Sequence, residues 1–134
     1  MADIAEKGVT SRTTNVTLTT TTETAIVTSP LVPVPLATAL IVIRAWVQLT
    51  TGAGTTGVTV RIRRGSDTTG TLVGEANVET AKAVAGSTEP FSITVSEARQ
   101  DLHMAEYTLT LQQAAATADG TALQATIEVE VLNG

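Results

Sequence analysis

Apolar and polar residues alternate along most of this chain with a period of two, and no other sequence feature limits its possible folds as strongly. In residues 41–50 the odd positions are Ile, Ile, Ala, Val and Leu, while the even positions include Arg44, Trp46 and Gln48. Side chains of a strand point alternately to opposite faces, so this pattern predicts a strand with one apolar face. The same alternation recurs at residues 58–63, 91–95, 107–112 and 123–131.

Shorter stretches rich in threonine and valine, which favour strands, predict weaker strands at residues 15–20, 23–28, 71–75 and 78–83. Turn-forming residues separate the strands at 51–57, 64–70, 86–90 and Asp119-Gly120. Pro30, Pro33 and Pro35 predict an extended crossing segment, because proline cannot donate a hydrogen bond within a central strand. One helical turn fits residues 96–105, with Ser96 as its N-cap.

Eight or nine short strands with one long early crossing predict an all-β fold. We expect a single-domain antiparallel β-sandwich, in the form of an eight-stranded jelly roll. Residues 13–134 form this domain in our prediction. Residues 1–12 are expected to be a flexible N-terminal arm, because Ala2 to Val9 show no periodicity.

Charge and hydropathy argue against two classes of partner. The formal net charge is −5 and the isoelectric point is near 4.7, whereas nucleic-acid binding depends on basic residues that neutralise phosphates. The longest apolar run, Leu36 to Ile43, is far shorter than the ~20 residues that a membrane-spanning helix needs. The first seven residues contain two acids and precede no apolar segment, so we expect no signal peptide. The expected partners therefore include neither nucleic acid nor membrane.

The residues for catalysis and cofactor binding are sparse. The chain has no cysteine and only His103, whose neighbours Ser96 and Asp101 do not form a recognisable triad motif. Its aspartates are scattered, so no metal site is expected. Residues 52–57 match G-x-G-x-x-G, but a strand pattern follows where a dinucleotide site needs a helix. We expect no enzyme activity, no catalytic residue and no cofactor.

Four residues are predicted to contact a partner. Arg61 and Arg63 share one strand face, where they either form surface ion pairs with glutamates or contact an acidic partner such as a neighbouring subunit. Trp46 lies on the polar face of its strand, so either a loop covers it or an interface buries it. Ile4, in the expected arm, is the fourth. The other aromatic residues match the apolar sets of their strands, which predicts core packing.

Several segments together carry a resemblance to a known group of proteins. They are Ala25-Ile26-Val27-Thr28-Ser29-Pro30, Ile43-Arg44-Ala45-Trp46-Val47-Gln48-Leu49-Thr50, Val60-Arg61-Ile62-Arg63-Arg64-Gly65, Gly70-Thr71-Leu72-Val73-Gly74 and Tyr107-Thr108-Leu109-Thr110-Leu111. With these segments the chain resembles small structural proteins of tailed bacteriophages. It is also similar in layout to the trimeric jelly rolls of the tumour-necrosis-factor type. The resemblance extends from about Val16 to Leu132.

This resemblance implies a non-enzymatic virion protein. The expected role is that of a capsid decoration (cement) protein, made in the host cytoplasm, which binds the major capsid protein or another virion protein at the capsid surface as a homotrimer. A head-fibre or tail-associated subunit is one alternative. A carbohydrate- or receptor-binding module that uses Trp46 is another. A cupin-like enzyme is a third, although its metal chemistry normally requires several histidines.

Overall fold

The computed structural model describes residues 3–18, 21–34, 39–50, 56–80, 88–99, 104–113 and 120–133. Within these ranges the chain forms strands and no helix. The strands are β1 (Asp3–Arg12), β2 (Val16–Leu18), β3 (Thr24–Thr28), β4 (Val32–Pro33), β5 (Ala39–Thr50), β6 (Thr56–Arg64), β7 (Leu72–Thr80), β8 (Thr88–Arg99), β9 (Met104–Ala105), β10 (Tyr107–Gln113) and β11 (Gly120–Asn133).

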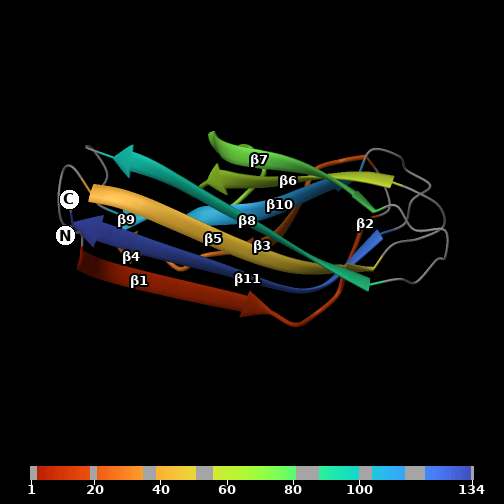
Figure 1. Ribbon diagram of the computed structural model, residues 1–134, viewed down its shortest axis with the longest axis horizontal. Coiled ribbons are helices and arrows are strands. Elements are labelled where there is room, and N and C mark those ends of the chain that lie inside the picture. The colour runs from red at the N-terminus through yellow and green to blue at the C-terminus, as the bar shows by residue number, and fades with distance from the viewer. Residues whose placement is uncertain are drawn as a thin grey trace.

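Two antiparallel sheets contain the long strands (Figure 1). Sheet A has the order β1-β11-β5-β8, with β2 pairing beside β1 on the same edge of β11, and sheet B has the order β3-β10-β6-β7. Between the sheets the chain crosses repeatedly, and only β6 and β7 are consecutive long strands of one sheet. This arrangement is the eight-stranded jelly roll, with β2 and the small β4–β9 ribbon added to it. The predicted fold class is therefore confirmed.

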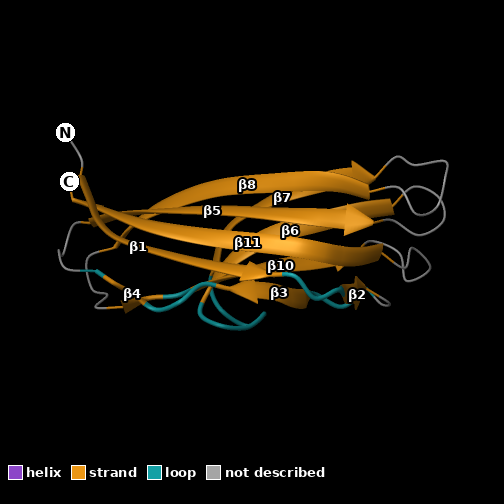
Figure 2. Ribbon diagram, turned by 90° about the horizontal axis from the view of Figure 1, so that it is seen from below, coloured by secondary structure: helices purple, strands orange, loops and turns teal. Residues whose placement is uncertain are grey.

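The apolar faces of the two sheets meet in one core, and Figure 2 shows the two layers. In β5 the alternate residues from Ala39 to Leu49 are at most 4% exposed, and those from Ala125 to Val131 in β11 are at most 1% exposed. Sheet B contributes Val58, Val60, Ile62, Tyr107, Leu109 and Leu111. Burial of one such aliphatic side chain stabilises the fold by about 1.5–3 kcal/mol. The period-two pattern predicts these strands because it places every second side chain in this core.

The prediction of a flexible arm at residues 1–12 is wrong for residues 3–12, which the structure describes. Asp3–Arg12 forms β1 and pairs with β11 from Asp3↔Asn133 to Arg12↔Ala125. Because β1 lies at the edge of sheet A, backbone pairing with the long β11 orders it without an apolar period. Gly8 packs closely on the crossing segment, since a Cβ there would lie 2.7 Å from Pro30 Cγ and from Val32 Cγ2.

Three local expectations also change. The predicted helical turn at 96–105 is wrong where the structure describes it, because β8 continues to Arg99 in register with β5 and Met104–Ala105 is β9. Residues 72–75 and 78–80 of the two predicted strands belong to the one strand β7, while residues 81–83 lie outside the described part of the chain. A register shift between Ala122 and Gln124 makes Ala122 buried and leaves Leu123 half-buried, although alternation predicted that Leu123 points inward.

Candidate binding surfaces

The outward side of sheet A, which we call the open face, presents regular rows of side chains across β8, β5, β11 and β1. Strand register gives one row of Ser92, Trp46, Thr126 and Ser11, and the next of Thr94, Arg44, Glu128 and Val9. Trp46 is 37% exposed and Val9 is 49% exposed. The open face therefore combines exposed apolar surface with hydroxyl and charged groups.

A shallow groove of about 250 Å³ lies on the open face beside Trp46. Its walls come from three neighbouring strands, with Arg44 and Trp46 from β5, Ser92 and Thr94 from β8, and Thr126 and Glu128 from β11. The Thr126 hydroxyl shares a 3.0 Å hydrogen bond with Ser11. Within the described part of the chain, the hydroxyls of Ser92 and Thr94 have no hydrogen-bond partner, so they can bind water or a ligand.

Charged side chains on the open face form ion pairs in which the cations are about half exposed and Glu130 is 13% exposed. Arg44 Nη1 lies 3.3 Å from Glu128 Oε1 and 3.1 Å from Glu130 Oε1, and Lys7 Nζ lies 3.5 Å from the same Glu128 oxygen. The side chains of Arg44 and Lys7 are 49% and 47% exposed. Exposed pairs of this kind contribute about 0–1 kcal/mol each. These charges can therefore change partners at little cost.

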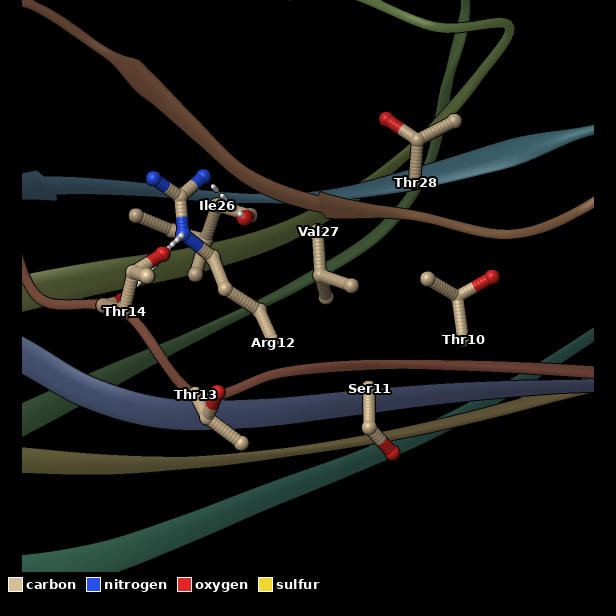
Figure 3. A pocket seen from close by; sticks show the side chains of 8 residues that line it. All are labelled: Thr10, Ser11, Arg12, Thr13, Thr14, Ile26, Val27 and Thr28. Atoms are coloured by element: carbon tan, nitrogen blue, oxygen red, sulfur yellow. Dashed lines mark hydrogen bonds between the residues drawn. The ribbon is translucent and has the colours of Figure 1, made fainter.

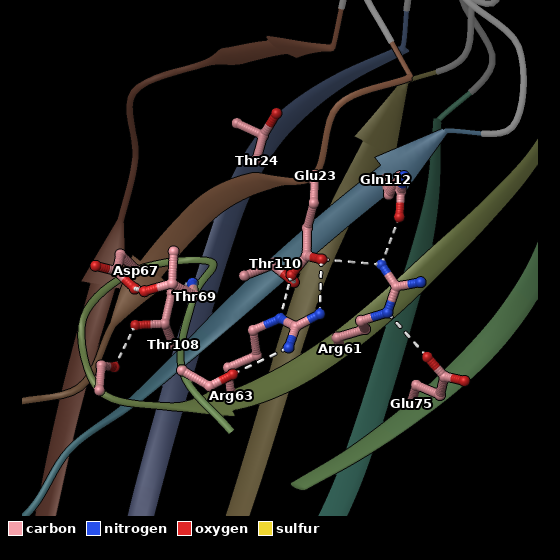
Figure 4. A network of polar contacts seen from close by, with 12 residues as sticks. Glu23, Thr24, Arg61, Arg63, Asp67, Thr69, Glu75, Thr108, Thr110 and Gln112 are labelled. Atoms are coloured by element: carbon pink, nitrogen blue, oxygen red, sulfur yellow. Dashed lines mark hydrogen bonds and ion pairs between the residues drawn. The ribbon is translucent and has the colours of Figure 1, made fainter. Parts of the chain in front are cut away.

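The outward side of sheet B, which we call the covered face, has a different organisation (Figure 4). Glu23, which directly precedes β3, accepts hydrogen bonds from Arg61, Arg63 and Thr110. Arg63 binds both carboxylate oxygens of Glu23, with Nη2 at 2.9 Å from Oε1. Arg61 Nε also donates to Glu75 at 2.9 Å. The two arginines are therefore neutralised within the molecule.

We call these contacts the Glu23 network. Its ion pairs are stronger than exposed ones because solvent screens them less. The side chains of Glu23, Arg61 and Arg63 are 14%, 18% and 19% exposed. The hydrogen bond from Arg63 lowers the pKa of the Glu23 carboxyl, partial burial opposes the shift, and Thr110 lowers it further. Thr110 itself is fully buried and donates to Glu23 Oε2 at 2.6 Å. Thr110 is therefore buried although it lies at an outward position of β10, where Glu23 contacts it.

The loop at residues 65–70 folds over the same face. Gly65 has a φ of +92°, a left-handed conformation that favours glycine. The buried Thr108 hydroxyl donates to Gly65 O at 2.6 Å, and Arg63 Nη1 donates to Gly70 O at 3.0 Å. Asp67 accepts hydrogen bonds from the backbone and hydroxyl of Thr69, which lower the pKa of its carboxyl. Through Gly65 and Gly70 this loop contacts Thr108 and Arg63 on the covered face.

A second polar cluster joins the two sheets, where Arg64 of β6 is 38% exposed and Glu97 of β8 is 12% exposed. Glu97 of β8 accepts two hydrogen bonds from Arg64 Nε at 3.1 Å, one to each oxygen, and one from Arg64 Nη2 at 2.7 Å. The phenol of the fully buried Tyr107 donates to Glu97 Oε1 at 2.6 Å. Tyr107 is a core residue, as its alternation predicted. Glu97 follows Phe91, Ile93 and Val95 on the inward side of β8. The sequence alone did not show that this inward position holds a carboxylate paired with Arg64 and Tyr107.

Arg12 supports the opposite edge of the sandwich, where β1 approaches β3 (Figure 3). Its guanidinium donates to Thr14 O at 3.2 Å, to Thr14 Oγ1 at 3.1 Å and to Ile26 O at 3.1 Å. Ile26 occupies a register shift in the pairing of β3 with β10, so its carbonyl lies outside the regular ladder. A depression of about 380 Å³ lies beside Arg12. We interpret Arg12 as a brace between the sheets.

Exposed apolar side chains gather on the β4–β9 ribbon. Pro33 pairs directly with Met104, and Leu31 precedes β4. Leu31 and Met104 are 58% and 41% exposed, and Pro33 is also exposed. Both views of the ribbon diagram place β4 at the end of the molecule that carries both chain termini (Figures 1 and 2). We call Leu31, Pro33 and Met104 the end patch. Sequence alternation missed it because the ribbon strands have two residues each.

The four residues predicted to contact a partner occupy different surroundings. Arg61 and Arg63 belong to the Glu23 network, which matches the ion-pair alternative for these residues. Trp46 lies on the polar face of β5, as predicted, and stays partly exposed. Ile4 pairs with Leu132 through β1, and its side chain lies outside the described set. His103 and most of the glycine motif at 52–57 also lie outside the described residues.

No cluster of three metal-ligating side chains occurs among the residues that the structure describes. In those ranges no helix is long and apolar enough to cross a membrane. Gly57 starts the alternating part of β6 rather than a helix.

Comparisons with known proteins concern the fold alone. No protein-family model matches the chain, and no curated protein is similar to it in sequence. The structure of infectious bursal disease virus, Gt strain, has a TM-score of 0.51 at 12% identity, over 95% of this chain and 32% of that chain. The chain thus spans about a third of that viral protein.

Two further solved structures are similar at lower TM-scores. Bacillus endospore appendages, described as a family of disulfide-linked pili, have a TM-score of 0.44 at 21% identity, over 91% of this chain and 88% of that chain. The EclA C-terminal domain, a sugar-binding protein, has a TM-score of 0.46 at 16% identity, over 87% and 78%. The likeness at a TM-score of 0.51 agrees with the β-sandwich fold and concerns nothing beyond the fold.

Proposed function

We propose that the protein is a non-enzymatic structural component of a virus particle, namely a capsid decoration protein that binds the major capsid protein through the end patch. The observation that carries the contact site is the exposure of Leu31, Pro33 and Met104, of which Pro33 pairs with Met104 and Leu31 lies two residues before Pro33. Contiguous exposed apolar side chains mark protein interaction sites. The virion role rests on the sequence resemblance to small phage structural proteins.

Two features support the end patch over the predicted arginine contacts. Arg61 and Arg63 are compensated by Glu23 and Glu75, so a partner would have to replace existing ion pairs to use them. The register of Ile4 with Leu132, and of Leu132 with Leu40, places Ile4 in a row of the open face and not in the end patch. Removing the apolar side chains of the end patch from water would favour binding without displacing an ion pair.

Co-sedimentation tests the proposed contact. Particles assembled from a candidate major capsid protein would be mixed with wild-type protein or with the variant Leu31→Ser/Met104→Ser. We expect the double variant to lose at least about tenfold in affinity, since hot-spot apolar residues contribute 1–2 kcal/mol each. The matched control is Leu72→Ser, because Leu72 is 43% exposed and lies on β7. Equal binding of the double variant and wild type would reject the end patch.

The oligomeric state is part of the same proposal. We propose a homotrimer on the capsid surface, following the resemblance of the sequence to trimeric jelly rolls. Light scattering at micromolar concentration should give three times the chain mass of 13.8 kDa. A strictly monomeric particle would reject the trimer and leave the contact proposal to the co-sedimentation result.

A further inference from the structure

The groove beside Trp46 has a mixed lining that suits one kind of small ligand. An exposed indole provides an apolar, electron-rich surface, and hydroxyls of Ser92, Thr94 and Thr126 surround it. Within the described part of the chain, the indole N–H and the hydroxyls of Ser92 and Thr94 make no hydrogen bond. Each hydroxyl can both donate and accept, while the indole can only donate. The lining thus offers several unused polar groups around one aromatic ring.

The charged wall of the groove adds both hydrogen-bonding roles. Arg44 presents only donors and Glu128 presents only acceptors, and these groups face each other at 3.3 Å. Because Arg44 is 49% exposed and Glu128 is 27% exposed, solvent screens the pair, and a ligand hydroxyl can insert its own donor and acceptor between them. The neighbouring Glu130 and Lys7 keep the local charge close to balance. A ligand with a strong charge of its own therefore gains little here.

From this chemistry we propose that the groove binds a neutral pyranose unit of a carbohydrate. A pyranose ring presents C–H groups on one face, which pack against the indole, and hydroxyls at its rim, which pair with the hydroxyl and charged side chains. The volume of about 250 Å³ lies just below the range of pockets for drug-sized ligands. It accommodates one ring, with any further sugar units extending across the open face.

This site is distinct from the surface used in the proposed function. Trp46 lies near the middle of β5 on the open face, whereas the end patch belongs to the β4–β9 ribbon. Failure of capsid binding and failure of carbohydrate binding are therefore separate results. One protein molecule can bind the capsid through the end patch and expose the groove to solvent.

Fluorescence provides a direct test, because Trp46 is the only tryptophan of the chain. Methyl β-D-glucopyranoside and methyl β-D-galactopyranoside would be titrated into the full-length protein, with sorbitol as the acyclic control. We expect a saturable change in emission for at least one pyranoside, with a dissociation constant on the order of 1 mM, as a small ligand in an open groove allows. Sorbitol should give no saturable change.

Two variants of equal shape assign the response to the groove. Thr94→Val removes a hydroxyl from the lining and should weaken binding about fivefold or more, whereas Thr17→Val, on the exposed side of β2, should bind as wild type. Circular dichroism would show that both variants fold. No saturable response to either pyranoside would overturn the proposal. It would also be overturned if sorbitol responded equally, or if dilution without sugar changed the emission, since a second copy would then cover Trp46.

Discussion

The open face and the covered face carry the same kinds of charged residue on strands of the same sandwich, yet they differ in what surrounds those residues. On the open face Arg44 is 49% exposed, and its partners Glu128 and Glu130 are 27% and 13% exposed. On the covered face Arg63 is 19% exposed and Glu23 is 14% exposed. Residues outside the strands account for the difference, because Glu23 and the loop at 65–70 cover sheet B. Ion pairs stabilise the covered face, whereas the open face keeps its polar groups available.

The largest expected effect comes from removing the central carboxylate of each face. Glu23→Ala leaves Arg61 without one partner and Arg63 without its carboxylate, so we expect a loss of about 1–3 kcal/mol in the free energy of unfolding. Glu128→Ala, on the open face, should lose about 0–1 kcal/mol, because water already solvates Arg44 and Lys7. Urea unfolding of both variants measures the difference.

Equal losses in these two variants would contradict the distinction between the faces. Glu23→Gln serves as a control for side-chain volume, since it keeps the shape and removes the charge. It should lie between wild type and Glu23→Ala in stability.

A smaller effect is expected from a matched pair of threonines. Thr110→Val removes the buried hydroxyl that donates to Glu23 at 2.6 Å and should lower the free energy of unfolding by about 1 kcal/mol. Thr126→Val removes a hydroxyl from the open face, where Ser11 can bind water instead, and should stay within about 0.5 kcal/mol of wild type. If Thr126→Val were the more damaging change, the open face would be part of the structural framework.

The smallest effect concerns pH. The pKa of Glu23 is lowered in the folded state, chiefly by its hydrogen bond with Arg63. A lowered pKa stabilises the fold at pH values above the unfolded pKa, and this stabilisation is lost as pH falls through the folded pKa. Between about pH 5 and pH 2 the wild type should therefore lose more stability than Glu23→Gln does. Parallel pH profiles of the two proteins would contradict this assignment.

The alternating pattern was sufficient to predict the long strands, because each inward residue enters the shared core. It also predicted that Trp46 lies on the polar face of β5 and that Tyr107 lies in the core. Other features depend on contacts between distant segments. β1 is ordered by backbone pairing with β11, which leaves no apolar period in the sequence.

The Glu23 network shows a similar limit. The two arginines were recognised as a pair on one face, but their partner Glu23 is 38 and 40 residues away in sequence. Only the pairing of β10 with both β3 and β6 brings these residues together. The end patch escaped prediction because a two-residue strand is too short to show alternation.

The separation of the two faces is tested most directly by measuring stability and ligand binding in Trp46→Ala and Arg63→Ala side by side. Saturation-transfer NMR with methyl β-D-glucopyranoside reports binding in both variants, and urea unfolding reports stability. We predict that Trp46→Ala loses the NMR signal and unfolds within about 0.5 kcal/mol of wild type. Arg63→Ala should keep the signal while losing about 1–3 kcal/mol. Loss of binding in Arg63→Ala while it remains folded, or full binding in Trp46→Ala, would contradict the account.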